Sequence, residues 1–314
     1  MHALLLHTPL HSILPELLSK LEAAFRFLAQ KIRIHNYPTV ESEPKVDYGN
    51  GAYSAVQNAS VVNPASLEGK VAVVTGSSKS IGASIAKELA SQGANVVVNY
   101  INDFKSADEL VLFIQSLGKG KAISVKADAG TISGSKALID ETIRAFGRLD
   151  ILILNAGIMG SKTLEQIDEP FIDAHFNMNV KGPLFLVKAA VEALSTPGGR
   201  IIFFSTSLTT ASSVLPNALC YVASKAAIEQ VSRVLAKDLG PRGITVNTIS
   251  PGPVDTPLFR EGKPQHVIDS IAAQCPGNRL GTPDDIAPVV AFLASPAAQW
   301  VNGQVIRVNG GFVV

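Results

Sequence analysis

From residue 70 onward, short apolar runs rich in β-branched residues alternate with longer stretches of helical periodicity. Because the apolar runs show no polar alternation, they indicate strands buried on both faces, as in a parallel sheet covered by helices. Seven such strands with six intervening helices predict one doubly wound α/β domain over residues 66–314. The expected strands are 71–75, 95–99, 122–126, 151–154, 200–205, 245–249 and 305–308, and the expected helices are 81–92, 106–117, 133–146, 170–194, 220–239 and 283–293.

Residues 1–65 differ in character from the rest of the chain. Between Leu14 and Ile32, apolar residues recur at steps of four and three, which predicts an amphipathic helix over about 12–34. Residues 36–64 hold Pro, Gly, Ser and Asn with little periodicity and predict a linker. We expect an N-terminal extension outside the catalytic domain. Since a lone helix of this length is marginal in water, its apolar face is expected to pack within an oligomer.

Charge and cysteine usage exclude several classes of partner. The formal net charge of +1 gives no electrostatic footprint for nucleic acid or an anionic membrane. No run of 18 uncharged apolar residues appears, so no membrane-spanning helix is expected. Cys220 and Cys275 have neither metal-ligand spacing nor a disulfide pattern, and no His/Cys/Asp cluster suggests a metal site. A cytoplasmic protein that acts on a small molecule without a metal is the simplest interpretation.

A turn of small residues, Thr-Gly-Ser-Ser-Lys-Ser-Ile-Gly over 75–82, follows the first expected strand. Such a turn lets backbone N–H groups and a helix N-terminus approach a pyrophosphate, although a simple tight turn before a helix is the alternative. The usual fingerprint has three glycines, and Ser80 replaces the middle one. The residues predicted to contact a dinucleotide here are Gly76, Ser78, Lys79, Ser80 and Ile81.

The end of the second expected strand bears on the choice between NAD and NADP. An NAD site commonly has Asp or Glu about 20 residues past the glycines, where it binds the ribose 2′-hydroxyl. This chain has Asn99 and Tyr100 there, so no carboxylate repels a 2′-phosphate, and Lys79 is placed to neutralise one. We predict NADPH. The alternative is that these residues merely end a strand and that Asp103 makes the contact typical of NAD.

Tyr221 and Lys225 lie four residues apart, and therefore one turn apart on one face of an expected helix. A cation there favours the phenolate and lowers the tyrosine pKa from about 10, which gives an acid or base near neutral pH. The spacing alone is also common on solvated helix faces. After the fourth expected strand, Asn155, Ala156 and Gly157 let a flat ring or a ribose lie against the backbone, unless Asn155 only forms a turn.

Taken together and in this order, these stretches resemble the short-chain dehydrogenase/reductase family, from about residue 68 to the C-terminus. The resemblance implies a Rossmann-like domain with a seven-stranded parallel sheet, a nicotinamide cofactor and a catalytic tetrad. Asn179, Tyr221 and Lys225 match three members of that tetrad, with Tyr221 and Lys225 also at the cofactor. The remaining matches are Asp128, near the adenine ring, and Pro251, Gly252, Val254 and Thr256, in the loop at the nicotinamide amide.

The fourth member of the tetrad, a serine, needs more care. In many family members it lies 13 residues before the tyrosine, which here would be Leu208. In the fungal naphthol reductases the gap is 14, which selects Ser207. In those enzymes a proline lies nine residues after the serine, as Pro216 does here. We choose Ser207, with Ser205 or Thr206 as the alternatives.

The resemblance implies an NADPH-dependent carbonyl reductase. Cys275, Phe259, Leu258 and Val214 suggest an apolar, aromatic or polyketide-like ketone, which would place the enzyme in secondary metabolism. The alternatives are a 3-oxoacyl-thioester reductase, a polyol dehydrogenase, a non-redox isomerase or cyclase, and a cofactor-sensing protein. A homotetramer, or failing that a homodimer, is expected through helices 170–194 and 220–239 and the C-terminal stretch. His175 is expected at an interior or interface position, and His266 on a solvated helix face.

Overall fold

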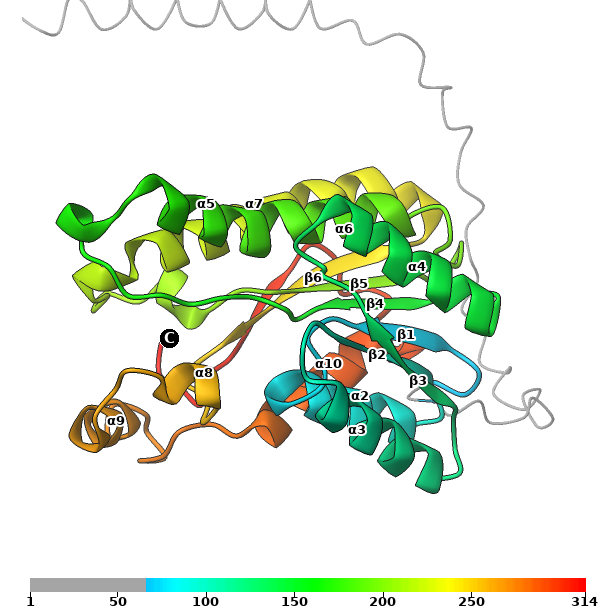
Figure 1. Cartoon of the computed structure of the whole chain (residues 1–314), viewed down its shortest axis with the longest axis horizontal. Coiled ribbons are helices and arrows are strands. Elements are labelled where there is room, and N and C mark those ends of the chain that lie inside the picture. The colour runs from blue at the N-terminus through cyan, green and yellow to red at the C-terminus, as the bar shows by residue number, and fades with distance from the viewer. Residues whose placement is uncertain (1–65) are drawn as a thin grey trace, which may run out of the picture. The chain divides into compact units, whose positions relative to one another are not determined.

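Seven parallel strands form one sheet in the order β3-β2-β1-β4-β5-β6-β7 (Figure 1). The computed structural model describes residues 66–314, so the amphipathic helix and linker predicted within 1–65 lie outside the described residues. The expected strands are confirmed with shifts of one or two residues at some ends. Their bounds are β1 Val71–Val74, β2 Asn95–Tyr100, β3 Ala122–Lys126, β4 Ile151–Leu154, β5 Arg200–Phe204, β6 Thr245–Pro251 and β7 Val305–Val308.

Helices cover both faces of the sheet. In Figure 1, α2, α3 and α10 lie on one side and α4, α5, α6 and α7 on the other. Successive strand residues point to opposite faces, so Val74 packs with the first group of helices and Val73 with the second. The bounds are α2 Ser80–Ser91, α3 Phe104–Ser116, α4 Ile132–Phe146, α5 Glu169–Phe176, α6 Gly182–Ala190, α7 Leu219–Leu239 and α10 Pro283–Ala294.

The long helix expected over 170–194 is interrupted. It consists of α5, a π-helical turn η3 over Asn177–Lys181, and α6. The proline at 183 has no N–H, so it cannot donate to the carbonyl of Asn179 four residues earlier. The Gly182 N–H instead reaches back to the Asn177 carbonyl. The prediction of one regular helix was therefore wrong, and the irregular turn contains Asn179.

Shorter elements connect the strands and helices. The chain after β6 forms two short helices, α8 Pro257–Arg260 and α9 Gln265–Ala272, of which only a helix at His266 was expected from the sequence. Thr256 caps α8 by accepting a hydrogen bond from the Phe259 N–H at 3.1 Å. The short 3₁₀ turns are η2 Leu164–Gln166, η4 Ser207–Thr209, η5 Pro216–Ala218, η6 Gly240–Arg242 and η7 Pro296–Ala298. Within residues 66–314, no helix has the length and apolarity needed to cross a membrane.

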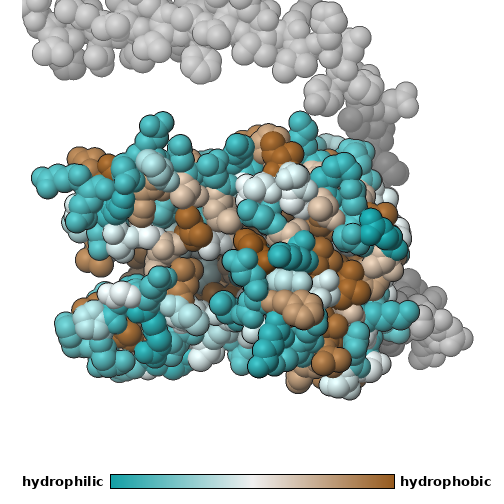
Figure 2. Space-filling view, viewed as in Figure 1, coloured by the Kyte–Doolittle hydropathy of each residue, from teal (hydrophilic) through white to brown (hydrophobic). Residues whose placement is uncertain are grey.

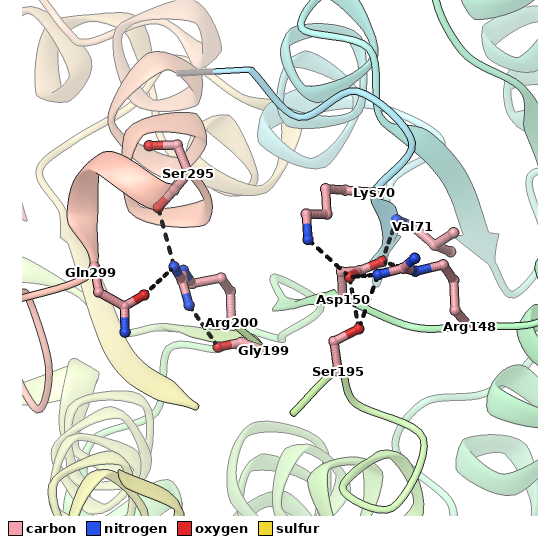
Figure 3. A network of polar contacts seen from close by, with 9 residues as sticks. All are labelled: Lys70, Val71, Arg148, Asp150, Ser195, Gly199, Arg200, Ser295 and Gln299. Carbon is pink, nitrogen blue, oxygen red and sulfur yellow. Dashed lines mark hydrogen bonds and ion pairs between the residues drawn. The ribbon is translucent and has the colours of Figure 1, made fainter. Parts of the chain in front are cut away.

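A buried carboxylate ties together the amino ends of the central strands. Asp150 is fully buried and accepts hydrogen bonds from the Val71 N–H at 2.9 Å, from Arg148 at 2.7 and 2.8 Å, and from Ser195 at 2.7 Å (Figure 3). Lys70 adds an ion pair at 3.4 Å. Burial by itself raises the pKa of Asp150, but these donors and charges outweigh it and hold the pKa below its ordinary value.

Arg200 is a buried cation at the same edge of the sheet. It starts β5, donates to Gln299 at 2.8 Å and to the Gly199 carbonyl at 3.1 Å, and is drawn with these partners in Figure 3. Burial lowers its pKa. Asp150 and Arg200 therefore both lie at the edge of the sheet opposite the carboxyl ends of the strands.

We predict that Asp150→Asn lowers the free energy of unfolding at pH 7 by about 2–4 kcal/mol, because it leaves several buried donors poorly paired. The folded pKa lies below the unfolded value of about 3.9, so the stabilisation is present above that value and is lost as the pH falls through the folded pKa. Urea unfolding should show the difference from wild type shrinking in acid. The exposed Asp140, 2.6 Å from Lys136, provides the control Asp140→Asn, with an expected loss below about 0.5 kcal/mol. Equal losses in the two variants would contradict this role for Asp150.

Candidate active site

The carboxyl ends of the strands collect the predicted site residues along one edge of the sheet. In the register of the sheet, Val74 of β1 pairs with Val98 of β2 and with Ile153 of β4. The glycine loop after β1 and residues 155–157 after β4 therefore lie side by side, at the point where the strand order reverses. Ligands of open α/β sheets bind at such a switch point.

The glycine loop leaves no room for side chains at two positions. A Cβ on Gly76 would lie 3.2 Å from the Ala156 Cα, and one on Gly82 would lie only 2.5 Å from the Gly76 carbonyl oxygen. Ser80, at the start of α2, has φ of +54°, a conformation that glycine adopts without strain. This serine therefore preserves the turn although it replaces a glycine. Lys79, Ser80 and Ile81 lie at the N-terminus of α2, where backbone N–H groups have no helical acceptor.

Two asparagines brace this loop from inside the protein. Asn155 donates to the carbonyls of Thr75 at 2.9 Å and Gly76 at 3.2 Å. Asn99 is buried, accepts from the Gly76 N–H at 3.1 Å and donates to the Ala127 carbonyl at 2.9 Å. Asn99 was predicted to contact the cofactor, but the structure places its side chain behind the loop, where it sets the loop's position.

The residues predicted to distinguish NADP from NAD differ in their exposure to solvent. Tyr100 is buried and its ring packs against Phe104, with centroids 6.0 Å apart. Lys79 is 65% exposed and lies 3.8 Å from Asp103. Asp103 accepts a hydrogen bond from the Ser106 N–H at 3.2 Å and so caps α3. Lys79 is therefore a largely exposed cation at the N-terminus of α2, paired within residues 66–314 only with Asp103 at 3.8 Å.

A cavity of about 560 Å³ opens beside Lys79. Its other lining residues, Pro257, Leu258, Arg260 and Glu261, come from α8 and the residue after it. Figure 2 shows that this face of the molecule is hollowed between the layer of α5 and α7 and the elements that include α8 and α9. The hollow connects the glycine loop with the segment after β6.

Three of the predicted catalytic elements meet at Gly157. A Cβ on this glycine would lie 3.1 Å from Asn179 Oδ1 and 3.2 Å from Lys225 Nζ. Asn179 accepts from the Ile158 N–H at 2.9 Å, and its amide donates to the Ile158 carbonyl and to Ser224, each at 3.0 Å. The π turn, the chain after β4 and α7 are thereby joined around one point.

Lys225 is buried without a carboxylate partner among the residues the structure describes. Its Nζ donates to the Phe204 carbonyl at 2.8 Å, and burial lowers its pKa to about 8. Tyr221 is half-buried one turn earlier, with its ring centroid 6.0 Å from that Nζ. Burial raises the pKa of the Tyr221 phenol, while the Thr206 hydroxyl acts to lower it. The sequence predicted that Lys225 would lower this pKa, but in the structure burial is the largest influence and the pKa lies above its ordinary value.

The three candidate hydroxyls after β5 have different surroundings. Ser205 donates to the buried carboxylate of Glu229 at 2.5 Å. Ser207 is buried and donates to the Ser250 carbonyl at 3.1 Å. Of the three, the Thr206 hydroxyl is the one that acts on the pKa of the Tyr221 phenol, lowering it. Sequence reasoning selected Ser207 by spacing and passed over Glu229, whose signal is its place four residues after Lys225 on the same helix.

The other predicted residues lie along the same edge. Asp128 follows β3 at the surface and accepts from the Gly130 N–H at 2.9 Å. Pro251 ends β6, and a Cβ on Gly252 would lie 2.8 Å from the Asn309 Cα. Val254 and Thr256 are buried at the start of the α8 segment. Ser78 and Ile81 are half-buried in the glycine loop and at the start of α2.

The two histidines lie as predicted. His175 is buried in α5, with Nδ1 2.8 Å from the Phe171 carbonyl oxygen and its ring 4.4 Å from the Phe171 ring. His266 lies exposed on α9. Neither histidine belongs to the cluster that Asn179 and Lys225 form around Gly157.

Comparison with known proteins agrees with this geometry. The family model described as enoyl-(acyl carrier protein) reductase matches residues 76–313. A hydroxynaphthalene reductase-like protein of Metarhizium brunneum is 42% identical over 262 residues, covering 80% of this chain and 97% of its own length.

Solved structures of related proteins share the fold. A short-chain dehydrogenase from Burkholderia cenocepacia, in complex with NADP, has a TM-score of 0.74 and 37% identity, covering 78% of this chain and 98% of its own. The promiscuous reductase LugOII, which catalyses keto-reduction at C1 during lugdunomycin biosynthesis, has a TM-score of 0.72 and 35% identity over the same shares. With its parallel sheet, its glycine loop and its Tyr221–Lys225 pair on α7, the chain belongs to the short-chain dehydrogenase/reductase family.

Proposed function

We propose that this protein reduces the ketone group of a small apolar or aromatic substrate to an alcohol, using NADPH. The observation that carries the proposal is the meeting of Tyr221, Lys225 and Asn179 beside a glycine loop at the switch point of the sheet. The NADP complex of the Burkholderia relative and the keto-reduction by LugOII support it.

The shape of the glycine loop fits a dinucleotide. The absence of side chains at Gly76 and Gly82 lets the loop pack closely against Ala156 and against itself, as the tight turn of a dinucleotide site requires. The N-terminus of α2 favours a pyrophosphate, and the exposed Lys79 favours a 2′-phosphate. Ser78, Ser80, Ile81, Asp128 and residues 155–157 would line the same cofactor, with Pro251, Gly252, Val254 and Thr256 at its nicotinamide end. When bound, the reduced nicotinamide supplies the hydride.

Tyr221 would act as the general acid. Its pKa, raised by burial, keeps the phenol protonated at neutral pH, so it can donate to the carbonyl oxygen as that oxygen becomes an alkoxide. Lys225, with a pKa of about 8, is charged at neutral pH yet able to release a proton. It is therefore suited to resupply Tyr221. The Asn179 side chain holds Ile158 and α7 in place around it.

Thr206 is the better candidate for the second hydroxyl at the substrate oxygen. It follows β5 and interacts with the Tyr221 phenol, so the two hydroxyls can bind one oxygen atom. Ser207 donates inward to the Ser250 carbonyl and would have to leave a buried hydrogen bond to reach the substrate. We therefore propose Thr206 in the role that sequence spacing assigned to Ser207.

Exposed apolar residues support an apolar substrate. Leu258 of α8 lines the cavity and is 42% exposed, and Val214, in the loop before α7, is 38% exposed. Apolar side chains in such positions favour a hydrophobic ring system over a polyol. The name of the Metarhizium relative points in the same direction. A reduced cytoplasmic setting, as predicted from the two cysteines, suits both cofactor and substrate.

Tyr221→Phe should lower turnover by about 10² to 10⁴, the range for general acid catalysis, with NADPH still bound. Thr206→Val should lower kcat by about 10² through loss of a hydrogen bond to the alkoxide. The measurement is the decrease of NADPH absorbance at 340 nm with a panel of ketones, quinones and thioesters.

Ser207→Ala provides the matched control for Thr206→Val and should change kcat by less than about threefold, since its hydroxyl faces Ser250. A large loss in Ser207→Ala with a silent Thr206→Val would return the role to Ser207. Near wild-type turnover in Tyr221→Phe would overturn the proposed mechanism.

Lys79→Ala should weaken NADPH binding by about ten- to a hundredfold, the value of one charge-assisted contact, and leave NADH binding unchanged. Lys87→Ala, on the exposed side of the same helix, is the control. Titration calorimetry with each cofactor gives the ratio directly. Equal losses for NADPH and NADH would show that Lys79 does not read the 2′-phosphate.

We also propose that the protein assembles as a homotetramer, with a homodimer as the alternative. Val234 on α7 is 69% exposed, Leu184 on α6 is 38% exposed, and Trp300 near the C-terminus is 98% exposed. Large apolar side chains left open in this way favour contact with a second copy. Light scattering at micromolar concentration should give the mass of four or two chains, and a monomer mass would contradict this expectation.

A further inference from the structure

Glu229 is a buried carboxylate that the mechanism above does not use. Its side chain belongs to α7, four residues after Lys225 and eight after Tyr221, so the three residues follow one another on one face of the helix. Only 8% of Glu229 is exposed. Within residues 66–314, no basic side chain forms an ion pair with it.

The partners of Glu229 are two hydroxyls on either side of Thr206. Its Oε1 accepts from Ser205 Oγ at 2.5 Å and from Thr209 Oγ1 at 2.9 Å. Ser205 is the first residue after β5, and Thr209 ends the turn η4. One carboxylate oxygen therefore holds both ends of the segment 205–209, with Thr206 between them.

The hydrogen bonds of Glu229 are one of three connections between α7 and the chain at the end of β5. The Thr206 hydroxyl acts on the pKa of Tyr221, Lys225 donates to the Phe204 carbonyl at 2.8 Å, and Glu229 accepts from Ser205 and Thr209. Three successive turns of α7 are thus linked to residues 204–209. The connections of Lys225 and Glu229 therefore help to fix the position of Thr206 relative to Tyr221.

Both hydroxyls also have an acceptor close by in the main chain. Ser205 Oγ lies 3.4 Å from the Lys225 carbonyl oxygen, and Thr209 Oγ1 lies 2.9 Å from the Thr206 carbonyl oxygen. If Glu229 were replaced by an apolar residue, neither hydroxyl would be left unsatisfied. Burial of a carboxylate is costly, so an apolar replacement is expected to fold. What it would lose is the connection across to η4.

We propose that Glu229 is a positioning residue, which holds segment 205–209 against α7 so that the Thr206 hydroxyl stays beside the Tyr221 phenol. The inference rests on the proposed function, since it assigns Glu229 a role through Thr206. Its action requires an acceptor oxygen at this place and not the negative charge. An error of about 1 Å in the placement of a catalytic group can cost about a hundredfold in rate.

The test compares Glu229→Leu with the conservative Glu229→Gln in the full-length protein. Glu229→Leu should lower kcat by about ten- to a hundredfold, with NADPH binding within about twofold of wild type. Glu229→Gln keeps a carbonyl oxygen that accepts from both hydroxyls, and should retain kcat within about threefold. Asp238→Leu, an exposed acidic residue of the same helix, is the control for the change of side chain.

A second measurement separates positioning from general loss of structure. Without cofactor or substrate, hydrogen–deuterium exchange in a peptide covering 205–209 should rise in Glu229→Leu and remain as in wild type in Glu229→Gln. Exchange in strands β1 and β4 should not change. Unaltered exchange at 205–209 in Glu229→Leu, or loss of protection throughout the domain, would overturn the proposal.

The double variant with Thr206→Val gives the decisive result. If Glu229 acts by placing Thr206, Glu229→Leu should lower kcat by no more than about twofold once Thr206→Val is present. Independent, multiplicative losses would overturn the proposal. A silent Thr206→Val would refute the proposed role of Thr206 itself, whereas a large effect of Thr206→Val with a silent Glu229→Leu would refute only the positioning role.

Discussion

The pairing of β1 with β4 is the contact on which the site depends. These strands are far apart in the sequence, yet their register places the glycine loop next to residues 155–157. The Thr75 hydroxyl then accepts from the Ala156 N–H at 2.9 Å, and Asn155 donates back to the Thr75 carbonyl. Loop and strand end are thereby fixed by reciprocal hydrogen bonds. Because neither Gly76 nor Gly82 has a side chain, the loop can approach the end of β4 and its own first residues this closely.

The buried ionisable side chains of α7 are held by uncharged polar groups and, in the part of the chain that the structure describes, not by ion pairs. Lys225 is buried against a backbone carbonyl, and Glu229 is buried against two hydroxyls. Fixed polar groups hold these two side chains at defined positions, which would suit the proposed transfer of a proton at this site. The ion pairs around Asp150 lie at the opposite edge of the sheet, where they serve stability. The ion pairs of Asp150 thus lie at the amino ends of the strands, and the candidate active site lies at their carboxyl ends.

The sequence predicted the structure correctly where a pattern of residues is typical of one kind of element. Continuous apolar runs predicted all seven strands, and the spacing of Tyr221 and Lys225 predicted their common helix face. It left the choice open where several residues of one type lie close together. Ser205, Thr206 and Ser207 all carry hydroxyls, and only their contacts with Glu229, Tyr221 and Ser250 tell them apart. Likewise Asn99 ends a strand in the sequence, but its amide is used inside the protein.

The π turn before α6 also sets the phase of the helical pattern. Each residue advances an α-helix by about 100°, so one additional residue in a turn rotates everything after it by that amount. The buried residues of α6, Leu186, Val187 and Ala190 among them, therefore keep their direction toward the domain only while the turn has its present length. A single deletion within 177–181 would restore a continuous helix and, at the same time, turn either Asn179 or the buried face of α6 away from the domain. The number of residues in this turn is therefore constrained by the need to keep both Asn179 and the buried face of α6 in place.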